Sequence, residues 1–277
     1  MRRVTILRHL PRTRMERTRK HVVRCLLLAG GLCLAVFVLM TIICGGDGRS
    51  LPSARLSAGA EAHPAEGVSG TFSIVAVDPN TGVCGAAVAS KYPAVGKVVP
   101  YVRAGVGAFC TQHWHNPKWG EHALDLLAKG HLPEQVLAEL LRDDPQRDKR
   151  QLAIIDMSGR AANRNPANAD PSGVWWGAAS GRYYACQGNT LVGCDVVFAM
   201  ARAYEQTQGS LADRLMAALV AGDQAGGDHR GRLAAGIRVA RKGVEGCWLE
   251  LYVDKSDDAV TELAQKYAAL EHEAKGP

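Results

Sequence analysis

A glycine followed by a threonine opens the most strand-like run of this sequence, and this pair is the first place where chemistry is expected. Thr71 begins the run TFSIVAVD directly after Gly70. Cleavage of the bond between them would give one residue both a hydroxyl nucleophile and a free α-amine. An α-amine has an ordinary pKa of about 7.7–8.0, so it can accept the hydroxyl proton near neutral pH. Thr71 is therefore a candidate N-terminal nucleophile or, if the bond stays intact, the first residue of a strand.

A lysine in the next apolar segment is the candidate for tuning that amine. Lys91 lies in the segment ASKYPAVG. An ammonium group close to an α-amine favours the neutral, basic form of the amine by charge repulsion. The alternative is a solvated lysine in a turn.

Residue types that bind metals offer a competing interpretation. The segment CTQHWHNPKWGEH contains Cys110, His113, His115 and His122 within thirteen residues. Zinc sites use these side chains, yet the segment lacks the HExxH and CxxC spacings of common zinc sites. We therefore expect neither a metal nor another cofactor.

The elements that must position these residues follow from periodicity and turn signals. Alternating β-branched residues on both sides of PNTG predict a β-hairpin of residues 71–78 and 83–90. The remaining predicted elements are one or two strands in 91–112, paired helices at 121–130 and 133–144, a strand and turn at 151–160, a long loop at 160–181, a strand at 182–189, helices at 194–206 and 210–222, strands at 232–240 and 246–254, and a helix at 257–273. This order predicts an α+β fold with layers of mostly antiparallel strands.

The N-terminal part of the chain predicts a membrane anchor. Residues 25–44 are a twenty-residue apolar run, long enough as a helix to span a bilayer. The basic segment 1–24 is expected in the cytoplasm by the positive-inside rule, which sends the following chain across the membrane. Residues 45–70 resemble a flexible linker, and 71–277 form the main domain. We expect that domain to be membrane-anchored and periplasmic, and released if the Gly70–Thr71 bond is cut.

The distribution of charge argues against a nucleic-acid partner. The formal net charge is +6, but the first 24 residues hold nine Lys or Arg and one Glu. The rest of the chain holds 24 basic and 26 acidic residues. A nucleic-acid groove usually needs a positive excess in the binding domain itself, so no nucleic acid is expected.

The cysteines do not have the pattern of a disulfide framework. Of the eight cysteines, three lie within or at the ends of 25–44, which leaves five in the main domain. Their strand-like, apolar positions favour small buried hydrophobic residues. A disulfide between Cys186 and Cys194 remains open.

Several motifs together resemble one protein family. They are the run from Thr71 to Gln112, NP at 116–117, LDLLAKG, QGN at 187–189 and GGDHRGR at 226–232. In order and spacing they are similar to the DUF1028 family, placed with the N-terminal nucleophile (Ntn) hydrolases, over roughly 71–254. The resemblance implies a four-layer αββα sandwich, here preceded by the predicted transmembrane helix.

The resemblance also implies roles for four residues of the reaction centre. Thr71 is expected as the nucleophile and Lys91 as its electrostatic tuner. Gln112 and Asn189 can donate hydrogen bonds from neutral amides to a developing oxyanion. The alternative for both amides is structural hydrogen bonding in loops.

Substrate contacts are expected from two further motifs. Asn116 lies in the NP motif, and Asp228, Arg230 and Arg232 lie in GGDHRGR. The arginines can clamp a carboxylate or carbonyl group, or Asp228 and Arg232 can pair and fix the loop. The segment 161–181 lacks the histidines that relatives often show there.

Two functions from different classes are consistent with these features. The first is an amide hydrolase of the Ntn type that acts on a peptide or small-molecule amide, with cell-wall material as a reasonable source for an exported domain. The second is a non-catalytic Ntn-fold module that binds a ligand or partner at the membrane surface. A homo-oligomer is open in either case.

Overall fold

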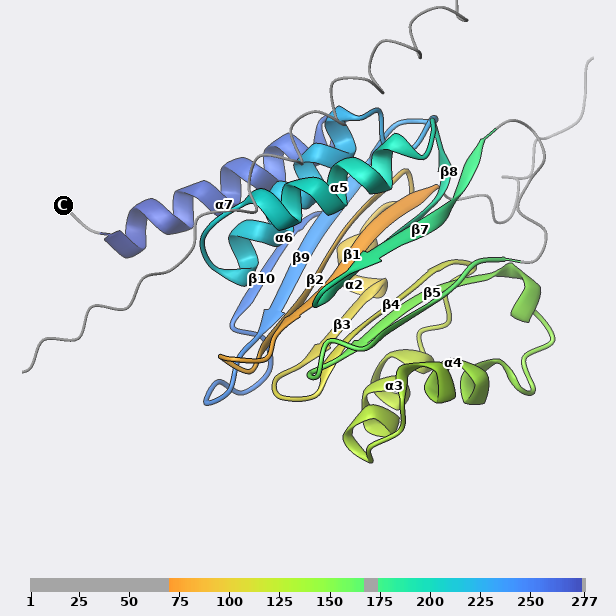
Figure 1. Ribbon diagram of the computed structural model, residues 1–277. Helices are drawn as coiled ribbons and strands as arrows, with labels where there is room; N and C mark the ends of the chain where they lie inside the picture. The colour runs from red at the N-terminus through yellow and green to blue at the C-terminus, as the bar shows by residue number, and fades with distance from the viewer. Residues whose placement is uncertain (1–69, 167–173, 276–277) are drawn as a thin grey trace, which may run out of the picture. The chain divides into compact units, whose positions relative to one another are not determined.

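Two antiparallel sheets form the centre of the computed structural model, which describes residues 70–166 and 174–275 (Figure 1). These residues belong to one compact unit, Ala62–Pro277. The strands are β1 (Thr71–Asp78), β2 (Val83–Ser90), β3 (Pro100–Arg103), β4 (Gly107–His113), β5 (Arg150–Asp156), β6 (Ala161–Arg164), β7 (Trp175–Gly181), β8 (Tyr184–Leu191), β9 (Ala234–Ala240) and β10 (Leu249–Val253). The helices are α2 (Val95–Val98), α3 (Trp119–Ala128), α4 (Pro133–Leu141), α5 (Asp195–Gln206), α6 (Leu211–Gln224) and α7 (Ala259–Lys275), with a 3₁₀ turn at Arg147–Lys149.

The larger sheet has six strands in the order β10-β9-β2-β1-β8-β7. The predicted hairpin of β1 and β2 is confirmed, and its register pairs Thr71 with Ser90 and Asp78 with Val83. Local chemistry closes the turn, because the Asp78 carboxylate accepts hydrogen bonds from the Asn80 backbone and the Thr81 hydroxyl. The hairpin therefore places Thr71 at the end of a central strand.

The smaller sheet has four antiparallel strands in the order β3-β4-β5-β6. Its inner face packs on the larger sheet through buried aliphatic side chains such as Val75, Val88 and Ile155. Its outer face is covered by the predicted helical hairpin, α3 and α4, as Figure 1 shows.

The outer face of the larger sheet is covered by α5, α6 and α7 (Figure 1). Strand alternation divides the side chains of β1 between the two interfaces. Phe72 and Ile74 belong to the cluster under the helices, whereas Val75 and Val77 belong to the cluster between the sheets. All side chains of β1 before Asp78 are buried, so both faces of this strand are covered.

The expected fold class needs correction. It combined a four-layer αββα sandwich with a preceding membrane-spanning helix, whereas the structure describes a mixed α/β unit with two antiparallel sheets. None of the helices within 70–166 and 174–275 is long and apolar enough to cross a bilayer. The longest, α7, has 17 residues and includes several charged side chains. The predicted span at 25–44 and its flanks lie outside the described residues.

The predicted loop at 160–181 is also wrong at both of its ends. β6 and β7 occupy these ends, and residues 167–173 lie outside the described residues. Both are edge strands with no β-branched residues, each held by hydrogen bonds to a single neighbouring strand. Their sequences carry little strand signal because they lack β-branched residues, and pairing with the neighbouring strand determines their conformation.

The five described cysteines are free thiols, so the disulfide between Cys186 and Cys194 is not formed. Cys84, Cys110 and Cys186 are fully buried, as predicted for small hydrophobic residues. Burial raises the pKa of the Cys84 and Cys110 thiols to about 12, which keeps both protonated at neutral pH.

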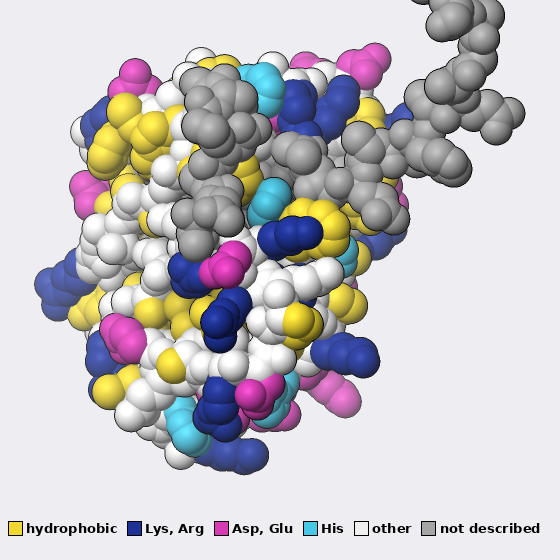
Figure 2. Space-filling view, turned by 90° about the vertical axis from the view of Figure 1, so that its right-hand side faces the viewer, with side chains coloured by type: hydrophobic (Ala, Val, Ile, Leu, Met, Phe, Trp, Pro, Cys, Tyr) yellow, Lys and Arg dark blue, Asp and Glu magenta, His cyan; other side chains and the backbone are white. Residues whose placement is uncertain are grey.

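Charges of both signs lie side by side on the face drawn in Figure 2. Lys, Arg, Asp and Glu side chains alternate there with hydrophobic ones. The described side chains of this face therefore form no extended patch of a single charge.

Candidate functional site

One end of the interface between the two sheets is polar. The strand alternation that points Val75 and Val77 at the smaller sheet also points Thr71 and Ser73 at it. Seven polar side chains meet there, each at most 2% exposed: Thr71, Ser73, Ser90, Gln112, Gln151, Gln187 and Asn189. We call these residues the polar cluster. Burying so many polar groups costs free energy unless they bond to one another, and the contacts below show that most do.

Thr71 and Ser90 form the part of the polar cluster next to Gly70. The Thr71 and Ser90 hydroxyl oxygens are 2.9 Å apart. Ser90 donates its only hydroxyl proton to the Gly70 carbonyl, at 2.6 Å, and it accepts from the Tyr92 backbone N–H at 3.0 Å. Because a serine has one proton to donate, the Thr71 hydroxyl must be the donor in the bond to Ser90. A chain of two O–H groups thus runs from Thr71 to the carbonyl of the residue before it.

The Gly70 carbonyl has a second donor. The Lys91 backbone N–H lies 3.3 Å from the Gly70 oxygen. Two donors therefore converge on one carbonyl oxygen, the arrangement that stabilises an oxyanion. The Lys91 side chain, by contrast, is exposed, so the contact of Lys91 with this site is made through its backbone.

The amides predicted as oxyanion donors lie in the polar cluster. Gln112 donates to the Thr71 carbonyl at 3.3 Å and to the Gln151 side-chain oxygen at 2.7 Å. Asn189 donates to the same Gln151 oxygen at 2.8 Å. Gln151 in turn donates to the Gly188 carbonyl at 2.7 Å. These bonds hold the start of β1 between β4, β5 and β8.

The motif GGDHRGR forms an ion pair beside Gly70. The Asp228 side chain is fully buried and accepts from Arg230 at 3.2 Å and 3.0 Å. An isolated bridge to Leu191 fixes Asp228 next to the end of β8. Arg232 pairs with Asp223. An ion pair within the motif thus fixes the loop, but the partner of Asp228 is Arg230 and not the expected Arg232.

Asn116 lies apart from the polar cluster. Its backbone N–H bonds to the Thr111 hydroxyl at 3.2 Å, and its side-chain oxygen accepts from the Lys118 backbone at 3.1 Å. In the structure Asn116 therefore shapes the turn that leads into α3.

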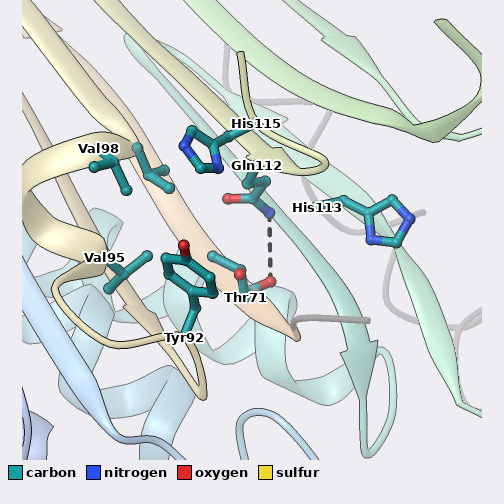
Figure 3. Close-up of a pocket in the computed structure, with 8 residues that line it drawn as sticks. Thr71, Tyr92, Val95, Val98, Gln112, His113 and His115 are labelled. Atoms are coloured by element: carbon teal, nitrogen blue, oxygen red, sulfur yellow. Dashed lines mark hydrogen bonds between the residues drawn. The ribbon is translucent and has the colours of Figure 1, made fainter. Parts of the chain in front are cut away.

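A small pocket opens beside Thr71 (Figure 3). Its lining residues are Thr71, Tyr92, Val95, Val98, Val99, Gln112, His113 and His115. Figure 3 shows Tyr92 and His115 on the side of Thr71 opposite to His113, with the Gln112–Thr71 bond between them. Its volume of about 10 Å³ is about that of one water position. In this state the pocket is too small for a substrate, and one of its lining residues, Tyr92, is 47% exposed.

Two strand residues near the site have left-handed backbone conformations. His113 has a φ of 64° and Thr190 a φ of 49°. For a β-branched residue such as Thr190 this conformation is a genuine outlier, and strain of this kind concentrates at functional sites. Burial and the nearby Arg230, Lys149 and Arg150 lower the pKa of His113 to about 4, so its ring is neutral at neutral pH.

The four residues that suggested a metal lie in different environments. Cys110 faces the apolar interface between the sheets, and His122 is exposed on α3. His113 packs edge-on against Trp176, with ring centroids 4.8 Å apart. Within 70–166 and 174–275, no group of three or more His, Cys, Asp or Glu side chains could hold a metal ion.

Ser90, Gln151 and Thr190 were missed by the sequence reasoning. A signal existed for Ser90, since the four-residue turn of the predicted hairpin pairs residue 71 with residue 90. Gln151 and Thr190 had no comparable signal, because their neighbours come from distant parts of the chain.

The chain is similar to a known protein family and to solved structures. The model of a family of unknown function, DUF1028, matches residues 71–263. The crystal structure of a DUF1028 protein from Silicibacter pomeroyi is similar with a TM-score of 0.66 and 30% sequence identity, covering 73% of this chain and 87% of that one. No curated protein matches the chain.

Proposed function

Because this chain belongs to the DUF1028 family, whose function is unknown, we propose its activity from the site itself. The proposal is an amide hydrolase of the Ntn type, in which Thr71 becomes the N-terminal nucleophile after cleavage of the Gly70–Thr71 bond. Its substrate is a peptide or small-molecule amide, and cell-wall peptides are one source of such amides.

One observation carries the proposal: the chain of hydroxyl groups from Thr71 through Ser90 to the Gly70 carbonyl. The Thr71 oxygen and the Gly70 carbonyl carbon are near neighbours along the chain, so attack closes a five-membered ring. The Ser90 O–H and the Lys91 N–H lie where negative charge develops on the Gly70 oxygen.

The self-cleavage step is balanced as follows. The Thr71 oxygen bonds to the Gly70 carbonyl carbon, the carbon–nitrogen bond breaks, and the hydroxyl proton ends on the Thr71 nitrogen. Water then attacks the resulting ester, and the carbon–oxygen bond breaks to leave a Gly70 carboxylic acid. The products are the released N-terminal segment and a Thr71 with a free α-amine and a free hydroxyl.

The mature site repeats this chemistry on an amide substrate. The α-amine accepts the Thr71 hydroxyl proton as the oxygen attacks the substrate carbonyl, and returns it to the leaving amine. Water then hydrolyses the acyl ester. Of the two amides expected as oxyanion donors, Asn189 is the better placed to donate, since its side-chain nitrogen makes one bond whereas that of Gln112 makes two.

A specific observation favours the second candidate, a non-catalytic module that binds a ligand or partner. With Gly70 in place, its carbonyl is fully bonded and the pocket beside Thr71 has room for about one water molecule. In that state the site is closed. The two functions therefore differ in whether the Gly70–Thr71 bond is intact in the working protein.

The intact mass of the full-length chain, together with N-terminal sequencing, tests the proposal. We expect the wild-type chain to be cut before Thr71, Thr71→Ala to stay whole, and Thr71→Ser to be cut. Tyr184→Phe, which removes a hydrogen bond to Glu205 away from the polar cluster, is the control and should be cut like wild type. An uncut wild-type chain supports the binding module, and cleavage of Thr71→Ala before residue 71 shows that another protease is responsible.

A further inference from the structure

Gly70 lies in a slot too narrow for any side chain. The slot is formed by Ser90, Thr190 and Asp228, together with the Lys91 backbone. A methyl group on the Gly70 α-carbon would lie 2.1 Å from the Thr190 hydroxyl oxygen and 2.2 Å from an Asp228 carboxylate oxygen. Non-bonded carbon–oxygen contacts are never so short. This space therefore has room for the α-hydrogen of a glycine but for no side chain. We call this space the Gly70 slot.

The wall of the Gly70 slot cannot easily give way. Asp228 is fully buried and is held by three hydrogen bonds from Arg230, one from the backbone and two from the guanidinium group. Thr190 keeps its left-handed backbone at an energetic cost, while its carbonyl accepts from both the backbone and the ring of His229. The loop after α6 and the end of β8 thus brace each other.

From this geometry we infer that the Gly70 slot is the acyl subsite of the enzyme, and that its substrates are glycyl amides: amides whose carbonyl carbon is followed by an α-carbon without a side chain. The inference rests on the proposed hydrolase activity and adds the substrate class to it. Thr190 and Asp228 are the residues that determine this specificity.

The chemistry of the slot supports its use by a substrate as well as by Gly70. Cleavage and departure of the N-terminal segment empty the slot, while the Ser90 O–H and the Lys91 N–H remain in place. A substrate carbonyl that enters takes the same two donors. Its carbon then lies within reach of the Thr71 hydroxyl, as the Gly70 carbon did. Its α-carbon faces the same wall of Thr190 and Asp228.

Two paired comparisons on the full-length protein test the inference. The first measures hydrolysis of N-acetylglycine p-nitroanilide and N-acetylalanine p-nitroanilide by the cleaved protein. We expect the alanyl compound to react at least about 100-fold more slowly, the upper part of the range for one extra carbon in a tight pocket. The second compares self-cleavage of the wild-type chain and Gly70→Ala by intact mass, and we expect the variant to stay whole.

A widened slot provides the reciprocal test. The double variant Thr190→Gly/Asp228→Ala removes every side-chain atom that a Gly70 methyl group would meet at about 2 Å. Glycine suits the left-handed backbone at position 190, and urea unfolding checks that the double variant folds. We expect it to lower the preference for glycyl over alanyl substrate at least tenfold, and to restore cleavage when combined with Gly70→Ala. Ala94→Gly, which also relieves a positive φ of 53° but lies outside the slot, is the matched control and should keep the wild-type preference.

The outcomes separate this inference from the function on which it rests. Equal rates on both anilides, or an unchanged preference in a folded Thr190→Gly/Asp228→Ala double variant, overturn the Gly70 slot as an acyl subsite and leave the hydrolase standing. Cleavage of Gly70→Ala at the wild-type rate likewise overturns the acyl subsite but not the hydrolase. A wild-type chain that remains whole overturns the hydrolase, and the acyl subsite with it.

Discussion

Replacing Ser90 with alanine is the sharpest test of the hydroxyl chain, because this one side chain serves three partners. In Ser90→Ala the Gly70 carbonyl loses its 2.6 Å donor, and the Thr71 hydroxyl and the Tyr92 N–H lose their acceptor. Only the Gly70 oxygen keeps another partner, the Lys91 N–H at 3.3 Å. The substitution therefore leaves two groups to be satisfied anew.

The magnitude follows from these losses. An unsatisfied buried polar group costs about 1–3 kcal/mol, and the Tyr92 N–H can partly recover through water. We expect Ser90→Ala to lower the free energy of unfolding by about 3 kcal/mol, or the melting temperature by roughly 6–12 °C. Loss of one oxyanion donor lowers a reaction rate by about 10²–10³-fold, and we expect the same for cleavage at Gly70–Thr71.

Two measurements on the same samples check this: urea unfolding, and the time course of cleavage by intact mass. Tyr184→Phe is the control, since it removes one hydrogen bond to the Glu205 carboxylate at 2.6 Å. It should lower stability by about 2 kcal/mol and leave cleavage unchanged. A Ser90→Ala chain that unfolds at the wild-type urea concentration and is cut at the wild-type rate would refute the assigned hydrogen bonds and their role.

Two further predictions concern stability. Arg150 lowers the pKa of the buried Asp144 carboxylate by hydrogen bonding, so the pair stabilises the fold above the ordinary pKa of Asp, and this contribution is lost as the pH falls below 4. Asp144→Asn should lower the free energy of unfolding at pH 7 by about 3 kcal/mol and flatten the decline of this free energy in acid. A variant whose stability is as acid-sensitive as that of the wild type would contradict this. Gly120→Ala would place a methyl group 2.0 Å from the Tyr101 ring. Urea unfolding should therefore show a free energy of unfolding lower by about 2 kcal/mol, despite the better helix propensity of Ala. A gain in stability would count against this packing.

The hairpin could be predicted because all of its determinants are local. The alternation of β1 and β2 and the turn residues between them lie within twenty residues, and the Asp78 side chain completes the turn with Asn80 and Thr81. β6 and β7 could not be predicted in this way. Each pairs with the strand next to it in the chain, β6 with β5 and β7 with β8. Neither contains a β-branched residue or an alternating pattern, so its own sequence does not predict a strand.

The candidate site also contains residues that could be predicted from the sequence and contacts that could not. The start of the strand singled out Thr71, and the family resemblance singled out Gln112 and Asn189. The structure brings all three together. Lys91 was chosen for its ammonium group, yet its backbone N–H makes the contact with Gly70. A sequence shows which side chains could act chemically. It does not show which backbone N–H groups do, because their role depends only on where the fold places them.

The sequence by itself determined where the chain alternates, where it turns, and that a threonine opens the central strand. These properties depend on neighbours a few residues apart. The tertiary structure alone decided that the serine opposite this threonine bonds to the preceding carbonyl, and that the loop of Asp228 closes on Gly70. The first contact joins residues twenty apart across the hairpin, and the second joins segments more than a hundred residues apart. Their distances are set by the packing of sheets and loops, for which the order of residues carries no local signal.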